Sequence, residues 1–146
     1  MYLMTCTRPD LAYPLSLLAR YVCSCMHRKV HWDAAKRVLR YLSSTLGMGL
    51  MLGGRGPVVL TSHADASWVD DSATQRSSQG YTFSLGSGSV SWRSTARLRF
   101  SAPQRGQLHL AYVATRANTA DIFTKALPPG DHQRFSTVLC LLALLS

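Results

Sequence analysis

The sequence predicts an α/β chain of the α+β kind, with an N-terminal helix pair, an antiparallel meander and C-terminal helices. Three observations lead to this fold class. Apolar residues recur at helical spacing over residues 9–46. Apolar and polar residues alternate over residues 80–94, as in strands that bury one face. Glycines and prolines separate these periodic segments from one another.

The N-terminal helix pair is predicted from its start signals and its apolar stripes. Pro9 and Asp10 suit a first helical turn, because proline lacks only a donor that is unpaired there. The second helix is predicted from about His31 to Ser44. Its apolar stripe consists of Ala35, Val38, Leu39 and Leu42. Basic residues lie mainly on its other side, namely Lys29, Lys36, Arg37 and Arg40.

A glycine-rich segment over residues 47–57 predicts a linker between the helices and the strands. Three strands of the meander are predicted at residues 58–65, 80–85 and 89–94. Within them, Phe83 and Trp92 are expected to contribute to the core. A fourth strand is predicted from Leu108 to Val113, and helices at about residues 119–127 and 131–145.

The composition suits a polyanionic partner. The net charge is +9, from sixteen Lys and Arg against seven acids, and phosphate neutralisation drives binding without sequence preference. The alternative is that the excess of bases reflects the loss of an acidic part of the chain. All seven acids are aspartates, which excludes any mechanism that needs a glutamate.

The sequence predicts a cytoplasmic or nuclear location and no secretion. The N-terminus lacks a basic region followed by an apolar run, and the four cysteines include no C-x-x-C pair. The apolar run at residues 138–145 is shorter than the roughly 20 residues that a membrane span needs. We therefore expect no membrane partner.

Four short motifs occur in a fixed order along the chain. They are TRPDLAY (residues 7–13), HWDAAKRVLRYL (31–42), GYTF through VSW (80–92) and ADIFTK (120–125). Together they resemble the end of the reverse transcriptase and the RNase H domain of Copia-type (Ty1/copia) retrotransposon Pol polyproteins. The resemblance implies a parent family that performs reverse transcription and cleaves RNA in RNA–DNA hybrids with Mg²⁺.

The ADIFTK motif follows the third motif far too soon, which implies a deletion near residues 100–107. The resemblance therefore divides the chain into four parts. Residues 1–46 would be the helical end of the reverse transcriptase or connection region, and residues 47–57 the linker. Residues 58–135 would be a truncated RNase H-like domain, followed by an apolar tail at residues 136–146.

Asp65 is the residue that the resemblance assigns to a catalytic and metal-binding role, now vestigial. Residues 64–68 (ADASW) look like the family motif S-D-A-D-W, with Ser67 in place of the second aspartate. The motifs expected to supply the other three carboxylates are missing. Cleavage with two metal ions needs several convergent carboxylates, because Mg²⁺ takes hard oxygen ligands. We therefore expect no enzymatic activity and no cofactor.

Three functions remain open on the sequence. The first is a degenerate, catalytically inactive Pol fragment. The second is a non-specific nucleic-acid-binding protein that uses Lys29, Lys36, Arg37 and Arg40, although these residues also suit a merely solvated helix face. The third is a residual metal-dependent nuclease.

The deletion also predicts an open sheet edge. In the intact family fold the strand that ends near Asp65 has a parallel neighbour, which falls in the deleted part. An uncovered apolar edge is a template for pairing with another chain. We therefore expect a tendency to self-association.

Overall fold

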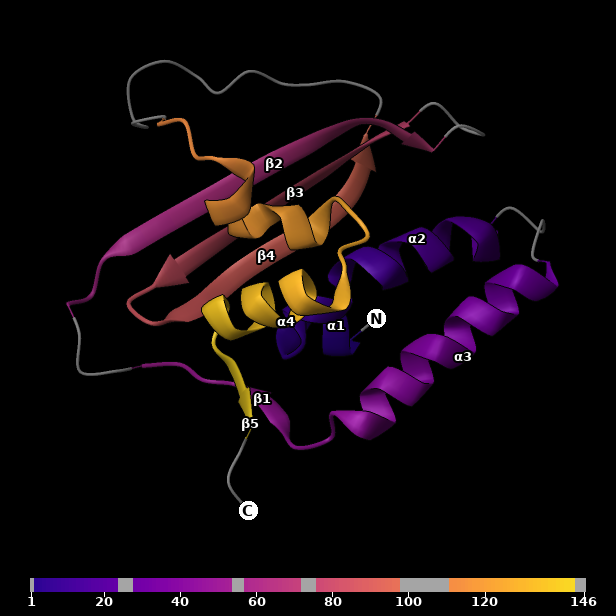
Figure 1. Cartoon of the computed structure of the whole chain (residues 1–146), viewed down its shortest axis with the longest axis horizontal. Coiled ribbons are helices and arrows are strands. Elements are labelled where there is room, and N and C mark those ends of the chain that lie inside the picture. Colours follow the sequence, from indigo (N-terminus) through magenta and orange to yellow (C-terminus); the bar gives the residue numbers. More distant parts are fainter. Residues whose placement is uncertain (1, 24–27, 54–56, 72–75, 98–110, 144–146) are drawn as a thin grey trace.

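The computed structural model describes residues 2–23, 28–53, 57–71, 76–97 and 111–143 (Figure 1). It combines helices with antiparallel strands, which confirms the predicted α+β class. The N-terminal elements are α1 (Tyr2–Cys6), the 3₁₀ helix η1 (Pro9–Leu11), α2 (Ala12–Cys23) and α3 (Lys29–Ser44). The helix pair predicted over residues 9–46 is thus confirmed. No helix of the described residues is long and apolar enough to cross a membrane.

Strands β2 (Leu60–Asp71), β3 (Arg76–Leu85) and β4 (Gly88–Arg97) form an antiparallel sheet in the order β2-β3-β4. This arrangement confirms the predicted meander. The chain reverses between β3 and β4 at Gly86, whose φ of +62° is the left-handed conformation that favours glycine. The register pairs Asp65 with Gly80 and Gly80 with Ser94, so one residue of each strand lies in a single row.

A second, two-stranded sheet joins distant parts of the chain. β1 (Met48–Leu50) pairs with β5 (Leu141–Ala143), so part of the predicted linker and part of the apolar tail are strands. The helix predicted over residues 131–145 was wrong at its C-terminal end, because α4 spans Pro129–Val138. The chain turns at Cys140, with φ of 59°, and the pairing with β1 buries Leu141.

The segment before α4 is more tightly wound than predicted. The helix expected at residues 119–127 is the 3₁₀ helix η3 (Thr119–Phe123), preceded by η2 (Thr115–Ala117). Asn118 caps η3, because its side-chain oxygen accepts a hydrogen bond from Ala120 N at 3.1 Å. The predicted strand at 108–113 is absent from its described residues, 111–113, while residues 108–110 and the predicted deletion near 100–107 lie outside the described part.

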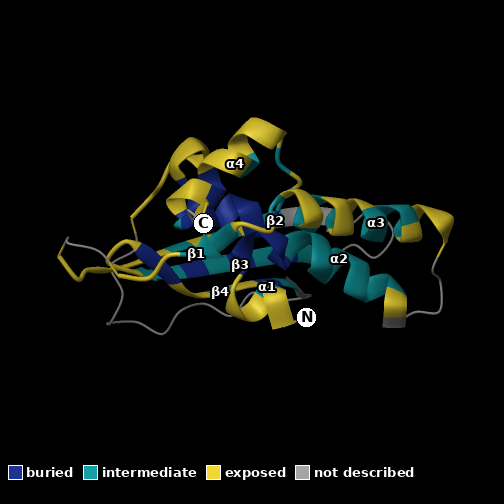
Figure 2. Ribbon diagram, turned by 90° about the horizontal axis from the view of Figure 1, so that it is seen from below, coloured by how far each residue is buried: buried dark blue, intermediate teal, exposed yellow. Residues whose placement is uncertain are grey.

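The hydrophobic core lies where the N-terminal and C-terminal segments meet, with η3 and α4 on one side of the sheet (Figures 1 and 2). It consists of Ala12, Ala120, Ile122, Phe123, Phe135 and Leu139. Trp92 packs against this cluster, as predicted, and its indole N–H donates to Met4 O at 2.6 Å. The core therefore depends on contacts between the two ends of the sequence.

The buried face of β3 is the opposite of the one that its aromatic residues suggest. Ser78, Gly80 and Thr82 are buried, whereas Tyr81 and Phe83 on the other face are only half-buried. The expectation that Phe83 belongs to the core was therefore wrong. Small residues occupy the covered face because η3 approaches the sheet too closely for larger ones.

Apolar residues are exposed on α3 and around the start of β2. Leu39, predicted to lie on the apolar stripe of α3, is 62% exposed, and no described residue of this helix is buried. At the sheet, β2 is an edge strand, and Val58, Val59 and Leu60 around its start are exposed. Among the described residues, no strand pairs with the outer edge of β2, which is the strand of Asp65, and self-association through this edge stays a prediction.

Candidate functional site

The row formed by Asp65, Gly80 and Ser94 lies beneath η3, which carries the ADIFTK motif. Thr124 Oγ1, at the end of η3, donates a hydrogen bond to Asp65 Oδ2. Ser94 Oγ donates to Phe123 O at 2.6 Å. These hydrogen bonds connect the ADIFTK motif with Asp65 of the ADASW segment and with Ser94, two residues after the VSW motif, at one place on the sheet.

Asp121 and Lys125 complete a charged cluster around Asp65. Lys125 Nζ lies 2.9 Å from Asp121 Oδ2 and 3.6 Å from Asp65 Oδ2. The Asp121 side chain is 3% exposed and the Asp65 side chain 18% exposed. Among the described residues, no hydrogen-bond partner reaches Asp121 Oδ1. The two carboxylates thus share one ammonium group in a largely buried place.

The electrostatics of this cluster follow from its burial. Burial raises the pKa of the Asp121 carboxyl and the nearby charge of Asp65 raises it further, against the hydrogen bond from Lys125. Burial lowers the pKa of the Lys125 ammonium. The hydrogen bond to Asp121 and the negative charges of Asp65 and Asp121 outweigh that effect, so the net shift is upward. Lys125 is therefore a fixed positive charge between the carboxylates.

No site role was assigned to Asp121 from the sequence, although the ADIFTK motif contains it. The sequence does not show that Asp121 lies close in space to Asp65, because the two residues are 56 positions apart in the chain. Within the described ranges, no group of three or more His, Cys, Asp or Glu side chains could hold a metal ion. The structure thus brings two carboxylates together where the sequence predicted one.

A second polar cluster links the TRPDLAY and HWDAAKRVLRYL motifs inside the N-terminal part. Arg8 contacts Asp10 through two hydrogen bonds, Nε to Oδ1 at 3.0 Å and Nη2 to Oδ2 at 2.8 Å. Tyr41 Oη donates to Asp10 Oδ2 at 2.7 Å. Arg8 also donates to Thr45 O at 3.1 Å and to Thr45 Oγ1 at 2.8 Å. This network fixes the end of α3 against η1.

Every charge in this second cluster is compensated. Arg8 is 5% exposed and Asp10 is 1% exposed, so each needs the other. Burial and the hydrogen bond to Asp10 raise the pKa of Tyr41 to about 12, so its hydroxyl remains a donor throughout the physiological range. The cluster is therefore a structural lock between two motifs, with no free group for chemistry.

The four basic residues predicted to contact nucleic acid are all on α3, at the margin of the molecule (Figure 2). Lys29, Arg37 and Arg40 are exposed. The Lys36 side chain is 42% exposed, and its Nζ lies 2.7 Å from Asp33 Oδ1. Three of the four charges are thus available to a partner, and the fourth is partly compensated by its neighbour.

Comparisons with known proteins connect the chain to transposons. It is 46% identical over 94 residues to "Secreted RxLR effector protein 161" of Plasmopara viticola, a match that covers 64% of this chain and 65% of the effector. It is 40% identical over 94 residues to the "Retrovirus-related Pol polyprotein from transposon TNT 1-94" of Nicotiana tabacum, where the match covers 7% of the polyprotein. No protein-family model and no solved structure matches the chain.

A third relative is matched over most of its own length. This is an uncharacterized mitochondrial protein of Arabidopsis thaliana, 35% identical over 81 residues, a match that covers 56% of this chain and 70% of the relative. The chain spans less than two thirds of the effector and a small part of the polyprotein. Identities of this size over more than half of the chain show common descent. The chain therefore belongs to one family with this mitochondrial protein, and it is a transposon-derived chain with homology to segments of retrovirus-related Pol polyproteins from Copia-type transposons.

Proposed function

We propose that this chain is an internally deleted fragment of the reverse transcriptase and RNase H region of a Copia-type Pol polyprotein, and that it does not cleave RNA–DNA hybrids. The observation that supports this most directly is the incomplete set of carboxylates. The chain contains no glutamate, and its described part brings only Asp65 and Asp121 together. When catalytic residues act as one unit, the loss of a single member removes most of the activity, so an incomplete set does not keep a proportional share of it.

The two carboxylates do not fit the Mg²⁺ ions of the parent family. Each such ion takes several oxygen ligands in near-octahedral geometry, and a two-metal site needs carboxylates that bridge both ions. Here Asp65 accepts a hydrogen bond from Thr124, and both carboxylates face the Lys125 ammonium. The donor set therefore suits a salt-bridged packing site better than a metal site, which agrees with the proposed loss of activity.

We expect the purified chain to leave an RNA–DNA hybrid intact in the presence of Mg²⁺ or Mn²⁺. The physical reason is that two carboxylates cannot position both metal ions and an attacking water. A labelled hybrid incubated with the protein and separated on a denaturing gel would show uncut RNA.

The matched variants for this assay are Asp65→Asn and Asp131→Asn, because Asp131 is an exposed aspartate of α4 that takes no part in the cluster. Metal-dependent cleavage that disappears in Asp65→Asn and persists in Asp131→Asn would contradict the proposal. That outcome would assign the chain to residual nucleases. Equal cleavage by all three proteins would instead indicate a contaminating nuclease, and the proposal would stand.

A second candidate function is weak, non-specific binding of nucleic acid through α3. The exposed Lys29, Arg37 and Arg40 and the net charge of +9 favour it. Trp32, on the same helix, is 65% exposed and offers a surface on which a base could stack. Binding of this kind releases counterions from the phosphates and has a dissociation constant of about 10⁻⁴–10⁻⁶ M at physiological salt.

We expect a variant with Lys29, Arg37 and Arg40 changed to Gln to bind more weakly and with less salt dependence. Removing three phosphate contacts should lower the slope of log K against log salt by about 2–3. Adding Lys36→Gln should change the slope less than each of the other three substitutions does, because Asp33 already partly compensates the charge of Lys36. Fluorescence anisotropy of a labelled oligonucleotide at several salt concentrations measures both quantities.

The control for this experiment removes the same charge elsewhere. Arg93, Arg116 and Arg134 are exposed and lie outside α3, so the triple Gln variant at these positions matches the net charge. If both variants lose the same affinity, only net charge matters and α3 is not a binding surface. If neither variant changes the slope, the basic face of α3 is merely solvated.

We propose a reducing compartment, the cytoplasm or the nucleus, as the location of the chain. Cys6 and Cys140, among the cysteines whose side chains are described, are free thiols. Free thiols are typical of proteins in reducing compartments. The names of the relatives mention secretion in one case and mitochondria in another, and these words apply to those proteins.

A further inference from the structure

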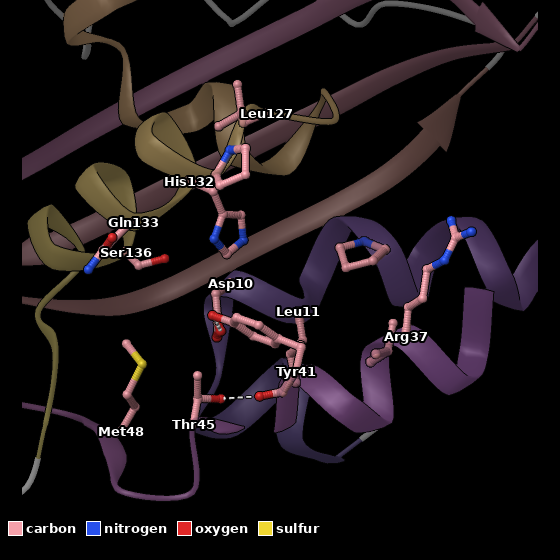
Figure 3. Close-up of a pocket in the computed structure, with 13 residues that line it drawn as sticks. Asp10, Leu11, Arg37, Tyr41, Thr45, Met48, Leu127, His132, Gln133 and Ser136 are labelled. Atoms are coloured by element: carbon pink, nitrogen blue, oxygen red, sulfur yellow. Dashed lines mark hydrogen bonds between the residues drawn. The ribbon is translucent and has the colours of Figure 1, made fainter. Parts of the chain in front are cut away.

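A pocket of about 490 Å³ lies where α2, α3 and α4 meet (Figure 3). This volume falls in the range of about 300–1,000 Å³ that is typical of small-molecule sites. The TRPDLAY motif, the HWDAAKRVLRYL motif and the C-terminal helix all contribute to its lining. Of the residues used in the candidate functions above, Arg37 is the one that lines this pocket.

The walls of the pocket are mainly apolar. The apolar side chains that line it are Leu11, Pro14, Val38, Met48, Leu127 and Pro129. They come from both ends of the sequence, so the pocket exists only in the folded chain. Walls of this kind favour a ligand with an apolar body, because burial of its surface contributes roughly 25 cal/mol per Å².

The charges around the pocket favour an anionic group on the ligand. Asp10 is the acid in the lining, and both of its oxygens accept hydrogen bonds, from Arg8 and Tyr41. Arg37 is exposed at the pocket, and within the described part of the chain no hydrogen bond or ion pair engages its guanidinium. The lining therefore carries one charge that no hydrogen bond or ion pair of the described residues engages, and that charge is positive; Asp33 attracts it only at longer range.

Ser136 marks the other side of the pocket. Figure 3 shows its hydroxyl pointing from α4 toward the side where Asp10 and Tyr41 lie, well apart from Arg37. Ser136 is 2% exposed, and no described group forms a hydrogen bond with its Oγ. A buried hydroxyl without a partner costs free energy that a ligand with a hydrogen-bonding group would recover.

We propose that this pocket binds a small apolar carboxylate, with the carboxylate at Arg37, the apolar body between α2, α3 and α4, and a hydroxyl or carbonyl at Ser136. A guanidinium binds a carboxylate through charge-assisted hydrogen bonds, which are stronger than those between neutral groups. Because Arg37 and Ser136 lie at separate ends of the pocket, the ligand would bind in one orientation. The site is independent of the carboxylate cluster at Asp65 and of the proposed loss of activity.

The probes for this site are octanoate, octanol and ω-hydroxyoctanoate, titrated into the full chain by calorimetry. We expect octanoate to bind with a dissociation constant of roughly 0.1–1 mM, as suits a ligand of this size. Arg37→Gln should weaken octanoate binding about tenfold and leave octanol unchanged. Arg40→Gln is the matched control, because Arg40 is exposed on the same helix and does not line the pocket.

Ser136→Ala tests the other end of the pocket. The native chain should bind ω-hydroxyoctanoate several-fold more tightly than octanoate, and the variant should bind the two equally. Amide chemical shifts of His132 and Gln133, which line the pocket on α4, should change on titration with either carboxylate.

Three outcomes would overturn the proposal. The first is equal loss of octanoate binding in Arg37→Gln and Arg40→Gln, which would indicate a general attraction to a basic helix. The second is shift changes confined to exposed apolar residues such as Leu39, which would indicate non-specific adsorption. The third is no binding of octanoate by the native chain. Because Arg37 is exposed, its variant tests the proposal even if Ser136→Ala fails to fold.

Discussion

Replacement of Arg8 by alanine is expected to lower the free energy of unfolding by about 3–5 kcal/mol. The change leaves the carboxylate of Asp10, which is 1% exposed, without its guanidinium partner. It also removes the two hydrogen bonds that Arg8 donates to Thr45 at the end of α3. An isolated buried charge costs far more than a surface ion pair contributes, so a domain of ordinary stability, about 5–15 kcal/mol, would lose a large share of it.

Urea denaturation followed by circular dichroism measures this effect. Arg40→Ala is the matched control, because Arg40 is an exposed arginine whose loss should change stability by less than about 0.5 kcal/mol. The double variant Arg8→Ala/Asp10→Ala should recover part of the loss, because it removes the unpaired charge as well. A single variant as stable as the native chain would show that Asp10 reaches water or another base, and that the lock between the two motifs is not formed.

The fold class and the order of elements could be predicted because they depend on local patterns. The stripe of α2 and the strands around Gly86 repeat at periods that a short window of sequence contains. Leu39 belongs to the apolar stripe of α3 and is nevertheless exposed. Helical spacing predicts which apolar residues share one face of a helix, but it does not predict which element covers that face. Burial of a helix face depends on neighbours that a window does not contain.

The features that sequence reasoning missed are contacts between distant segments. The pairing of β1 with β5 joins residues about 90 positions apart, and neither segment carries strand signals of its own. The role of Asp121 depends on η3 lying above the row that contains Asp65. In the same way, the aromatic residues of β3 suggested the wrong core face, because the element that covers the strand selects small residues.

Gly80 is the residue of β3 where η3 leaves the least room for a side chain. The substitution Gly80→Ala is expected to lower the free energy of unfolding by about 1–3 kcal/mol or more. A Cβ atom at this position would lie 2.4 Å from Phe123 Cβ and 3.1 Å from Thr124 Cγ2. Phe123 is fully buried in the core, so it cannot move aside without disturbing its neighbours. Gly80→Val should cost more than Gly80→Ala, because the added methyl groups need further space.

Thermal unfolding checks this expectation, with a shift in Tm of about 2–4 °C for each kcal/mol. The matched control is Gly130→Ala in the first turn of α4, where an added Cβ meets no atom within 4 Å. This control should raise stability slightly, because alanine loses less conformational freedom than glycine in a helix. A melting temperature of Gly80→Ala equal to that of the native chain would mean that η3 does not lie against the sheet. The contact of Thr124 with Asp65 would then be lost as well, because the close approach at Gly80 is what holds the ADIFTK motif over the strand of Asp65.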